Sequence, residues 1–316
     1  MPGDLTFRPA GVEVAAFIAD LHTANFPQEP LDPLLVSRWL SDPMREWERF
    51  RVELEGRPIG YAFTAHFPWN RVAARHATVF ADLLPERKNA ELLKPVYEFA
   101  DGRARASGAE VTRTYIFESD HVAQAVTTEL GFSPDRRERY WELDLKANAS
   151  RLGDLAGQSR ARMREQGLEL LTFAEDPDPG RHAKTYTTST EGELDVPRTG
   201  DHVPDSLEKF LDWLGSPGIH EDRIWIARDG DRVVGLSTLS YPPTRGIVNT
   251  DWTAVARSHR GRGVARALKL ETLLQAIDLG VDRVRTDNDS ANAPILHINA
   301  EMGYRNVFDR LWLMKR

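Results

Sequence analysis

Two stretches of the chain alternate apolar and polar residues on either side of a glycine-containing turn, at residues 50–63 and 224–237. This alternation predicts two β-hairpins. Each hairpin is followed by a further strand-like segment and then by apolar residues that recur with a period near 3.6. That period predicts helices over residues 90–106 and 264–280, the second of which is expected to end at Gly280.

The same order of elements continues to the end of each half. A short strand, a helix that ends at a glycine and a terminal strand follow in turn, at residues 111–117, 121–131 and 139–145, and again at residues 281–287, 293–303 and 310–316. Strands that alternate with helices after a hairpin predict a mixed α/β (α+β) fold, with a mostly antiparallel sheet flanked by helices. We expect each terminal strand to close the sheet of its own half.

An internal repeat relates the two halves. Corresponding residues recur in the same order at separations of 171–174 residues: Trp39 and Trp213, Gly56 and Gly230, Gly131 and Gly303, and Trp141 and Trp312. Repetition at a nearly fixed period indicates two copies of one structural unit.

The expected domains are residues 1–146 and 167–316. Residues 147–166 match neither unit, and their charge and helical propensity predict a solvated connecting helix.

Composition serves mainly to exclude functions. The chain has 316 residues, no cysteine and a formal net charge of −7, so a disulfide scaffold, a thiol nucleophile and a dedicated nucleic-acid binder are disfavoured. No apolar run suits a membrane span, and the first residues do not resemble a signal peptide. We therefore expect a cytoplasmic protein without a membrane partner. No histidine spacing suits a helix-borne zinc pair, and no metal is expected.

The clearest chemical signal is a strand-to-helix loop in the second half. Residues 260–265 read Arg-Gly-Arg-Gly-Val-Ala and lead directly into the predicted helix. Glycines allow the backbone to approach a ligand closely, and the N–H groups at a helix start suit a phosphate or pyrophosphate. The chain has no P-loop motif, and a dinucleotide fingerprint fails because Arg266 occupies the position of its third glycine.

The loop fits the pattern Arg-x-x-Gly-x-Ala, with Arg260, Gly263 and Ala265, and resembles the acetyl-CoA pyrophosphate loop of the GNAT N-acetyltransferase superfamily. A second GNAT signature resembles the segment from Asn292 through a helix to Gly303 and Tyr304. The resemblance covers residues 167–316 well and residues 5–145 in outline. Two such units in one chain resemble the tandem GNAT proteins, a group that includes mycothiol synthase, although nothing identifies an inositol-glucosamine pocket.

The first copy is interpreted as degenerate. Its corresponding loop, residues 83–91, has no glycine, and the carboxylates of Glu86 and Glu91 would repel a pyrophosphate. The position of the signature asparagine is taken by Asp120, a further repulsive change. This half is expected to be structural or to form a wall of the acceptor cleft.

The resemblance implies direct transfer of acetyl from acetyl-CoA to an amine. It places the cofactor on Ala254, Val255, Ala256, Arg260, Gly261, Arg262, Gly263, Val264, Ala265 and Asn292. It also implies that the backbone N–H of Val255 polarises the thioester carbonyl where the fourth strand leaves the fifth.

An ammonium acceptor requires a base, because the protonated amine is not nucleophilic. Asp251 is the first candidate, since it lies four residues before Val255 and should share its face of the strand. Asp287 and Asp289 are alternatives. Many family members carry a tyrosine acid where this chain has Asn299, so the proton donor to the thiolate stays open.

The acceptor itself is unidentified: a small-molecule or peptide amine. Its pocket is expected between the first strand and the hairpin of the second half, where Glu193 and Asp195, with Asp287, would suit a cationic amine. Other polar residues of that segment are His182, Tyr186, Glu191, Arg198, His202 and His220. His297 and Tyr304 are expected to be structural, Tyr304 in the core. The protein is expected to be a monomer or homodimer.

Two other readings stay open. A non-catalytic acetyl-CoA-binding sensor would explain the missing tyrosine, and amine-stimulated release of CoA would distinguish it from an enzyme. A purely structural partner module is disfavoured by the intact second loop.

Overall fold

The computed structural model describes residues 5–196 and 199–316. The strands of the first half are β1 (Leu5–Pro9), β2 (Glu46–Leu54), β3 (Arg57–His66), β4 (His76–Leu83), β5 (Val111–Phe117) and β6 (Ser133–Asp144). Its helices are α1 (Ala15–Asn25), α2 (Pro33–Leu40), α3 (Ala90–Ala106) and α4 (His121–Glu129).

The second half has the same order of elements. Its strands are β7 (Glu169–Thr172), β8 (Ile224–Asp229), β9 (Arg232–Ser240), β10 (Asn249–Val255), β11 (Arg283–Asp289) and β12 (Arg305–Lys315). Its helices are α6 (Arg181–Glu193), α7 (Leu207–Leu214), α8 (Val264–Asp278) and α9 (Ala293–Met302), and α5 (Leu145–Glu165) joins the halves. Mixed α/β architecture and the predicted order of elements in each half are confirmed.

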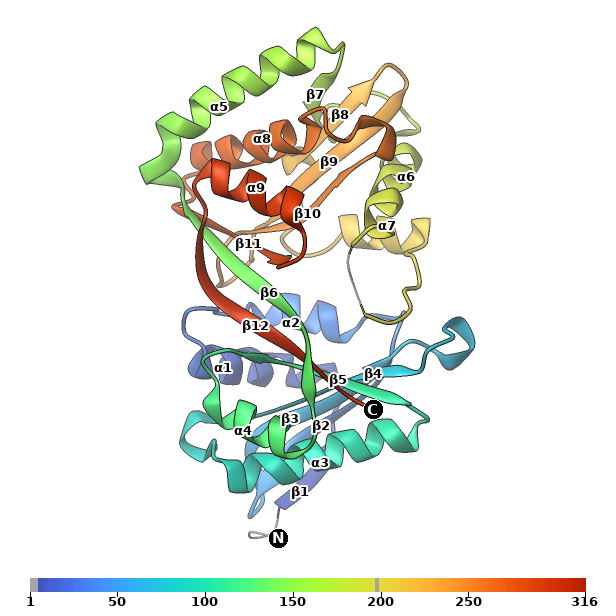
Figure 1. The fold of residues 1–316 in the computed structure, drawn as a ribbon, viewed down its shortest axis with the longest axis vertical. Helices are drawn as coiled ribbons and strands as arrows, with labels where there is room; N and C mark the ends of the chain where they lie inside the picture. The colour runs from blue at the N-terminus through green and yellow to red at the C-terminus, as the bar shows by residue number, and fades with distance from the viewer. Residues whose placement is uncertain (1–4, 197–198) are drawn as a thin grey trace.

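One continuous sheet runs through both halves, in the order β1-β2-β3-β4-β5-β12-β6-β11-β10-β9-β8-β7. The two terminal strands are exchanged: β12 pairs with β5 of the first half, and β6 pairs with β11 of the second. β6 and β12 also pair with each other along the middle of the molecule, and the C-terminus lies beside the first half (Figure 1). The expectation that each terminal strand closes its own half was wrong, because sequence spacing gives the order of strands and not their partners.

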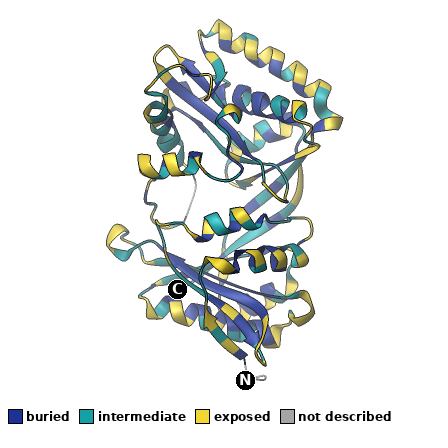
Figure 2. Cartoon of the chain, turned by 180° about the vertical axis from the view of Figure 1, so that it is seen from behind, coloured by how far each residue is buried: buried dark blue, intermediate teal, exposed yellow. Residues whose placement is uncertain are grey.

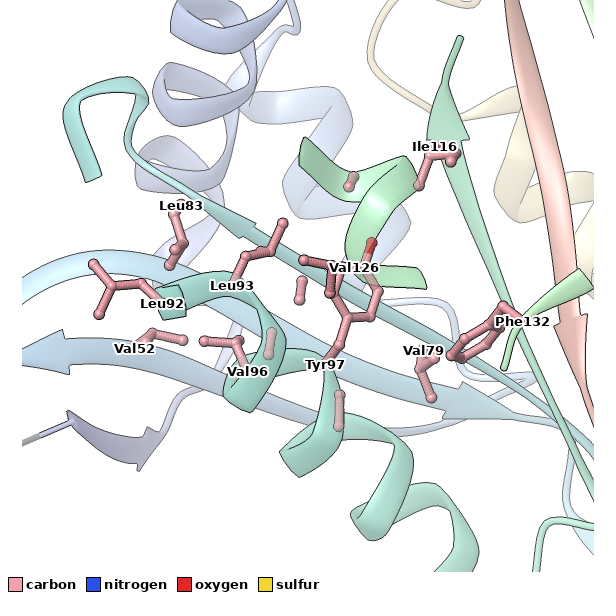
Figure 3. Packing of buried hydrophobic residues seen from close by; sticks show 14 of the residues in the cluster. Val52, Val79, Leu83, Leu92, Leu93, Val96, Tyr97, Ile116, Val126 and Phe132 are labelled. Atoms are coloured by element: carbon pink, nitrogen blue, oxygen red, sulfur yellow. The ribbon is translucent and has the colours of Figure 1, made fainter. Parts of the chain in front are cut away.

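Helices cover the sheet and bury its strands, while their outer faces are exposed (Figure 2). In the first half, α3 packs Leu93, Val96 and Tyr97 against the strands in the cluster drawn in Figure 3. Among the described residues, no helix combines the length and the apolar composition that a membrane crossing requires.

The connecting helix is not solvated on all sides, contrary to expectation. α5 packs along α8 and buries Leu152, Ala156 and Met163. Arg160 on α5 also makes two hydrogen bonds of 2.7 Å with Glu271 on α8. The helix is long and carries charged residues on its outer side, but one apolar stripe ties it to the second half.

The first half contains a divergence between its two parallel strands. β4 and β5 pair from His76 opposite Val111 to Thr78 opposite Arg113, and β4 then continues to Leu83 without β5 as its neighbour. We call the region beside residues 79–83 the first wedge. The cavity left there measures about 10 Å³, which is room for no more than about one water molecule.

An ion cluster fills the first wedge. The Nζ atom of Lys88 lies 2.7 Å from Asp82 and 2.6 Å from Asp120, above the ring of Phe26. Burial lowers the pKa of Lys88, but the two carboxylates outweigh burial and raise the pKa overall. Asp120 also caps α4 through the N–H of Ala123. Asp120 is therefore not a free carboxylate, because it shares Lys88 with Asp82, and the cluster occupies the space. Since one lysine balances only one of the two carboxylates, the repulsion of a pyrophosphate by Asp120 stays a prediction.

Substituting Lys88 with methionine should destabilise the protein by about 3–5 kcal/mol, because two enclosed carboxylates would lose their cation. Lys94→Met is the matched control: Lys94 pairs with Glu129 at the surface, where solvent screens the pair, so its loss should cost far less stability. Urea unfolding measures both values. Equal, small losses in the two variants would show that the ion cluster does not hold the first wedge together.

Candidate active site

A corresponding divergence lies in the second half. Within the described residues 199–316, β10 and β11 pair at one register position, Asn249 opposite Arg285. β10 continues to pair with β9 as far as Val255 opposite Gly235, so its other edge is left without a neighbouring strand. We call the region between β10 and β11 beside residues 250–255 the second wedge, and the Asn249 end its apex.

The backbone of Val255 faces this wedge. The N–H of the next residue, Ala256, donates to Val234 on β9 at 2.9 Å. Because successive N–H groups of a strand point to opposite edges, the N–H of Val255 points away from β9 and toward the wedge. This orientation is the one that the family resemblance requires of it. The side chains of Ala254, Val255 and Ala256 are buried.

A β-bulge at the apex overturns one expectation. The register between β10 and β9 shifts between Thr250 and Trp252, so Asp251 is an extra residue. Bulges break the two-residue alternation of side chains. Val255 consequently packs in the cluster beneath α8, whereas Asp251 accepts a 2.9 Å hydrogen bond from Trp213 on α7. Asp251 and Val255 do not share a face.

The glycine loop at the other end of the wedge has the backbone that the sequence predicts. Gly261 and Gly263 have φ angles of 71° and 91°, in the left-handed region that favours glycine. Gly263 precedes the first residue of α8, Val264, and the first N–H groups of a helix have no partner within it. These N–H groups lie at the positive end of the helix dipole, which suits an anion. Ala265, in the first turn of α8, is partly exposed beside them.

Cations surround the loop, but two of them are engaged. Arg260 lies 2.6 Å from Asp195 and also donates to the carbonyl of Val255 at 3.0 Å. Arg262 donates to Gln166 at the end of α5 at 2.8 Å. The guanidinium of Arg162, also on α5, lies about 3.5 Å from where a Cβ on Gly263 would be. Sequence reasoning missed Arg162, because it belongs to the connecting helix.

The predicted acceptor residues do not gather in one place. Hydrogen bonds from Arg257 and then Arg260 hold the pKa of Asp195 well below its usual range, and they place this carboxylate at the glycine loop. Glu193 contacts His202 at 2.7 Å. Neither acid lines the cavity described below, and Arg198 lies outside the described residues.

The main cavity lies between the halves and measures about 350 Å³. α1 and α2 and the adjoining strands of the first half form one wall, and β10 and β11 contribute the apex of the second wedge. Aromatic side chains line much of it, namely Trp39, Tyr61, Tyr115 and Tyr140. This cavity, which no local sequence pattern predicts, brings Asp287 and Asn249 together.

Most charges in the cavity are paired. Glu29 lies 3.0 Å from His22, Arg285 lies 2.8 Å from Glu142, and Arg310 lies 3.1 Å from Glu138. Asp32 accepts hydrogen bonds from Thr244 and Arg245, which outweigh burial and lower its pKa to about 2.

Asp287 differs from these acids. Solvent reaches its side chain in the cavity, yet the protein surrounds it closely enough that desolvation raises its pKa to about 7. The charges of Glu138, Glu29 and Asp251 act in the same direction. The pKa of Asp251 is also raised, by desolvation, although the hydrogen bond from Trp213 opposes the change. Asp287 is therefore a carboxyl with a raised pKa in the cavity at the apex of the second wedge.

On the opposite face of the sheet, polar side chains lie beneath the wedge. Asn299 on α9 is fully buried and donates to Asn288 at 2.6 Å. Tyr304 is buried, as expected of a core aromatic, and His297 is exposed. Asn292 precedes α9 and is partly exposed, and Asp289 accepts from the N–H of Ala291. Lys269 on α8, which the sequence analysis did not single out, is buried here as well.

Residues 189–304 match the family model of the acetyltransferase (GNAT) family. A streptothricin acetyltransferase from Streptomyces lavendulae is 29% identical over 137 residues, which covers 38% of this chain and 71% of the relative. The segment that matches the family model includes the glycine loop at residues 260–265. The relative from Streptomyces lavendulae is named for acetyl transfer.

Solved structures share the whole fold. A tandem GNAT protein from the clavulanic acid biosynthesis pathway superposes with a TM-score of 0.74 and 18% identity, covering 99% of this chain and 98% of its own. A GCN5-related N-acetyltransferase from Sphaerobacter thermophilus superposes with a TM-score of 0.69 and 17% identity, covering 100% of this chain and 96% of its own. A glucosamine N-acetyltransferase region of a fungal multi-domain enzyme superposes with a TM-score of 0.70 and 14% identity, covering 99% of this chain and 38% of the other.

Three observations point to the same family: β10 and β11 diverge, a glycine loop precedes α8, and residues 189–304 match the family model. This chain carries a domain of the GNAT acetyltransferase family, and the protein is an acetyltransferase.

Proposed function

We propose that the second half transfers an acetyl group from acetyl-CoA to the amine of a small cationic acceptor, which binds in the cavity between the halves. In this proposal residues 1–146 and 167–316 are two GNAT units, joined by residues 147–166, and the first unit forms a wall of the acceptor site without binding CoA. The observation that carries the proposal is Asp287, a carboxyl with a pKa of about 7 that lines this cavity where β10 and β11 diverge.

The second half fits acetyl-CoA, the co-substrate of this family. Residues 260–265 supply the glycine backbone and the helix start for a pyrophosphate, and Arg162 adds a cation beside Gly263. The edge of β10 that faces the wedge would hold the pantetheine chain. In this proposal the N–H of Val255 binds that chain and not the thioester carbonyl, because five residues of strand, roughly 16 Å, separate Val255 from Thr250 at the apex. The first half lacks these features, because its loop has no glycine and Lys88 with its two carboxylates fills the first wedge.

The cavity favours a cationic amine of modest size. Its volume of about 350 Å³ lies at the small end of the range for small-molecule sites. Aromatic faces attract cations, and Asp287 offers an anionic partner. The name of the relative from Streptomyces lavendulae, a streptothricin acetyltransferase, supports a small-molecule rather than a peptide acceptor.

The residues divide the chemistry between them. An ammonium group must lose a proton before its nitrogen can attack, and a base with a pKa near the operating pH does this best. We assign this role to Asp287 rather than Asp251, because Asp287 lines the cavity while Asp251 is held by Trp213. The acceptor nitrogen then forms its bond to the acetyl carbon while Asp287 holds the proton, and the aromatic wall limits the access of water.

Substituting Gly263 with valine should weaken CoA binding by roughly tenfold or more, since a β-branched side chain is strained at this φ and would stand where the pyrophosphate is proposed. Gly131→Val is the matched control: Gly131 has a φ of 84° and open space around it, but it ends α4 in the first half. Calorimetry measures both affinities. CoA binding by the Gly263 variant that equals that of the control would contradict the proposed cofactor site.

Substituting Asp287 with asparagine should lower kcat/KM for amine acceptors by roughly 10²–10⁴ at neutral pH, the usual range for a positioned base. In the wild type, activity should rise with pH through about 7 as Asp287 ionises. The variant should lose this limb, and its deficit should shrink as pH approaches the pKa of the acceptor. Release of free CoA thiol across a panel of small diamines and neutral amines provides the measurement.

Two further variants separate the alternatives. Asp282→Asn removes an exposed carboxylate just before β11 and should leave the profile unchanged. Asp251→Asn should change kcat/KM less than Asp287→Asn does. If the Asp251 variant instead loses the neutral limb and the Asp287 variant keeps it, the base is Asp251.

A further inference from the structure

Lys269 is a buried lysine that the proposed function does not use. Its exposure is 2%, and it stands in the middle of α8 between the buried Leu268 and Leu270. Its Nζ atom lies 3.4 Å from the hydroxyl of Thr250, a long contact for a group with three donors. An ammonium group is rarely buried without an anion beside it.

Lys269 reaches the apex of the second wedge from the face opposite the cavity. Thr250 is the first residue of β10 beyond the register position that joins β10 to β11. Thr250 and its neighbour Asn249 are adjacent on one strand and point to opposite faces. Asn249 lines the acceptor cavity, and Thr250 contacts Lys269. An acceptor and Lys269 would therefore approach the apex from opposite sides.

The surroundings of Lys269 offer one acid and several neutral groups. From β11, the Asp287 charge raises its pKa, but burial outweighs this effect and lowers the pKa to about 8. The ring of Tyr304 lies 5.7 Å from Nζ, and burial raises the pKa of its hydroxyl, so this group stays neutral. On α8 itself, the nearby Glu271 is turned to Arg160 on α5.

A second buried group beneath the wedge is also incompletely bonded. Asn299 donates to Asn288, but within the described residues its Oδ1 atom has no hydrogen-bond partner. Asn299 occupies the position where the family resemblance expects a tyrosine proton donor, and an amide cannot supply a titrating proton. Asn299 is therefore not the proton donor to the thiolate, and a donor from this chain has to be a different residue.

We propose that Lys269 is the proton donor to the departing CoA thiolate. This inference rests on the proposed function. As the nitrogen of the acceptor forms its bond to the acetyl carbon, the carbon–sulfur bond breaks and its electron pair stays on sulfur. Lys269 gives one proton from Nζ to that sulfur, and Asp287 takes the proton that the acceptor nitrogen loses. The products are the acetylated amine and CoA with a neutral thiol, and the balance needs no other reactant.

The two groups also restore each other. After one turnover Asp287 is protonated and Lys269 is neutral. With pKa values of about 7 and about 8, return of the proton from Asp287 to Lys269 is favourable. Because the two groups interact, the values belong to the pair in a measured titration.

The first test uses wild-type protein with CoA and needs no turnover. The ultraviolet absorbance of the thiolate, followed against pH, gives the pKa of the bound CoA thiol. A nearby ammonium should lower it below the pKa of the thiol of free CoA measured in the same way, and Lys269→Met should return it to that value or above. A bound thiol with an ordinary pKa in the wild type would overturn the proposal, whether or not the variant folds.

The second test follows kcat at saturating acetyl-CoA and acceptor. Lys269→Met should lower kcat by roughly 10²-fold at neutral pH, the low end for a positioned acid, because a thiolate already leaves readily. Wild-type kcat should fall above about pH 8 as Lys269 loses its proton, and the variant should lack this fall. Lys146→Met, which removes an exposed lysine of α5, is the control and should behave as wild type.

These results separate the two proposals. A wild-type protein that binds no CoA, or binds it without acetylating any amine, contradicts the proposed function itself. A wild type that binds and acetylates, together with a Lys269 variant that keeps the thiol pKa and the alkaline fall in kcat, contradicts the role of Lys269 alone.

Discussion

The pairing of β6 with β12 is the constraint on which the rest of the molecule depends. Each of these strands ends one half and hydrogen-bonds to the penultimate strand of the other, so the sheet cannot be divided without breaking both ladders. The exchange fixes α1 and α2 of the first half opposite β10 and β11 of the second. The cavity between the halves, with Tyr140 of β6 in its wall, is a product of this pairing. A rigid sheet can hold a carboxylate and an acceptor in register more accurately than a flexible hinge between domains.

The two halves share one architecture but differ at their wedges. A buried lysine lies beside each wedge, and its neighbours differ between the halves. Lys88 lies between two carboxylates of its own chain, which raise its pKa and close the first wedge. Lys269 has a hydroxyl as its near neighbour, and burial lowers its pKa to about 8. The first lysine has its anions within the protein. In our account Lys269 meets its anion, the CoA thiolate, only when CoA is bound. Its burial without an anion, which is unfavourable in the free protein, then makes it a proton donor.

Local patterns were sufficient to predict what depends on local structure. Alternation and period gave the order of elements in each half, and glycines at positive φ explain why the loop around Gly261 and Gly263 could be recognised from sequence. The partners of the terminal strands could not be predicted, since strand pairing joins residues far apart in the chain. The face on which Asp251 lies was also predicted wrongly. The bulge at Asp251 inserts one residue into the strand, and such an insertion leaves no mark on the apolar pattern of the sequence. Asp195 joined the glycine loop because Arg257 and Arg260 attract it. A signal for Lys269 was present, as a cation between two leucines within a predicted helix.

The account's central claim is that acetyl transfer takes place at the apex of the second wedge, with the acceptor and Lys269 on opposite faces of the sheet. A crystal structure of the protein with CoA tests this claim most directly. The account predicts one CoA per chain, its pyrophosphate on the N–H groups of residues 261–265 and its sulfur beside Thr250, within hydrogen-bonding reach of Lys269. A second CoA in the first wedge, or a sulfur directed away from Thr250 and the cavity, would contradict it.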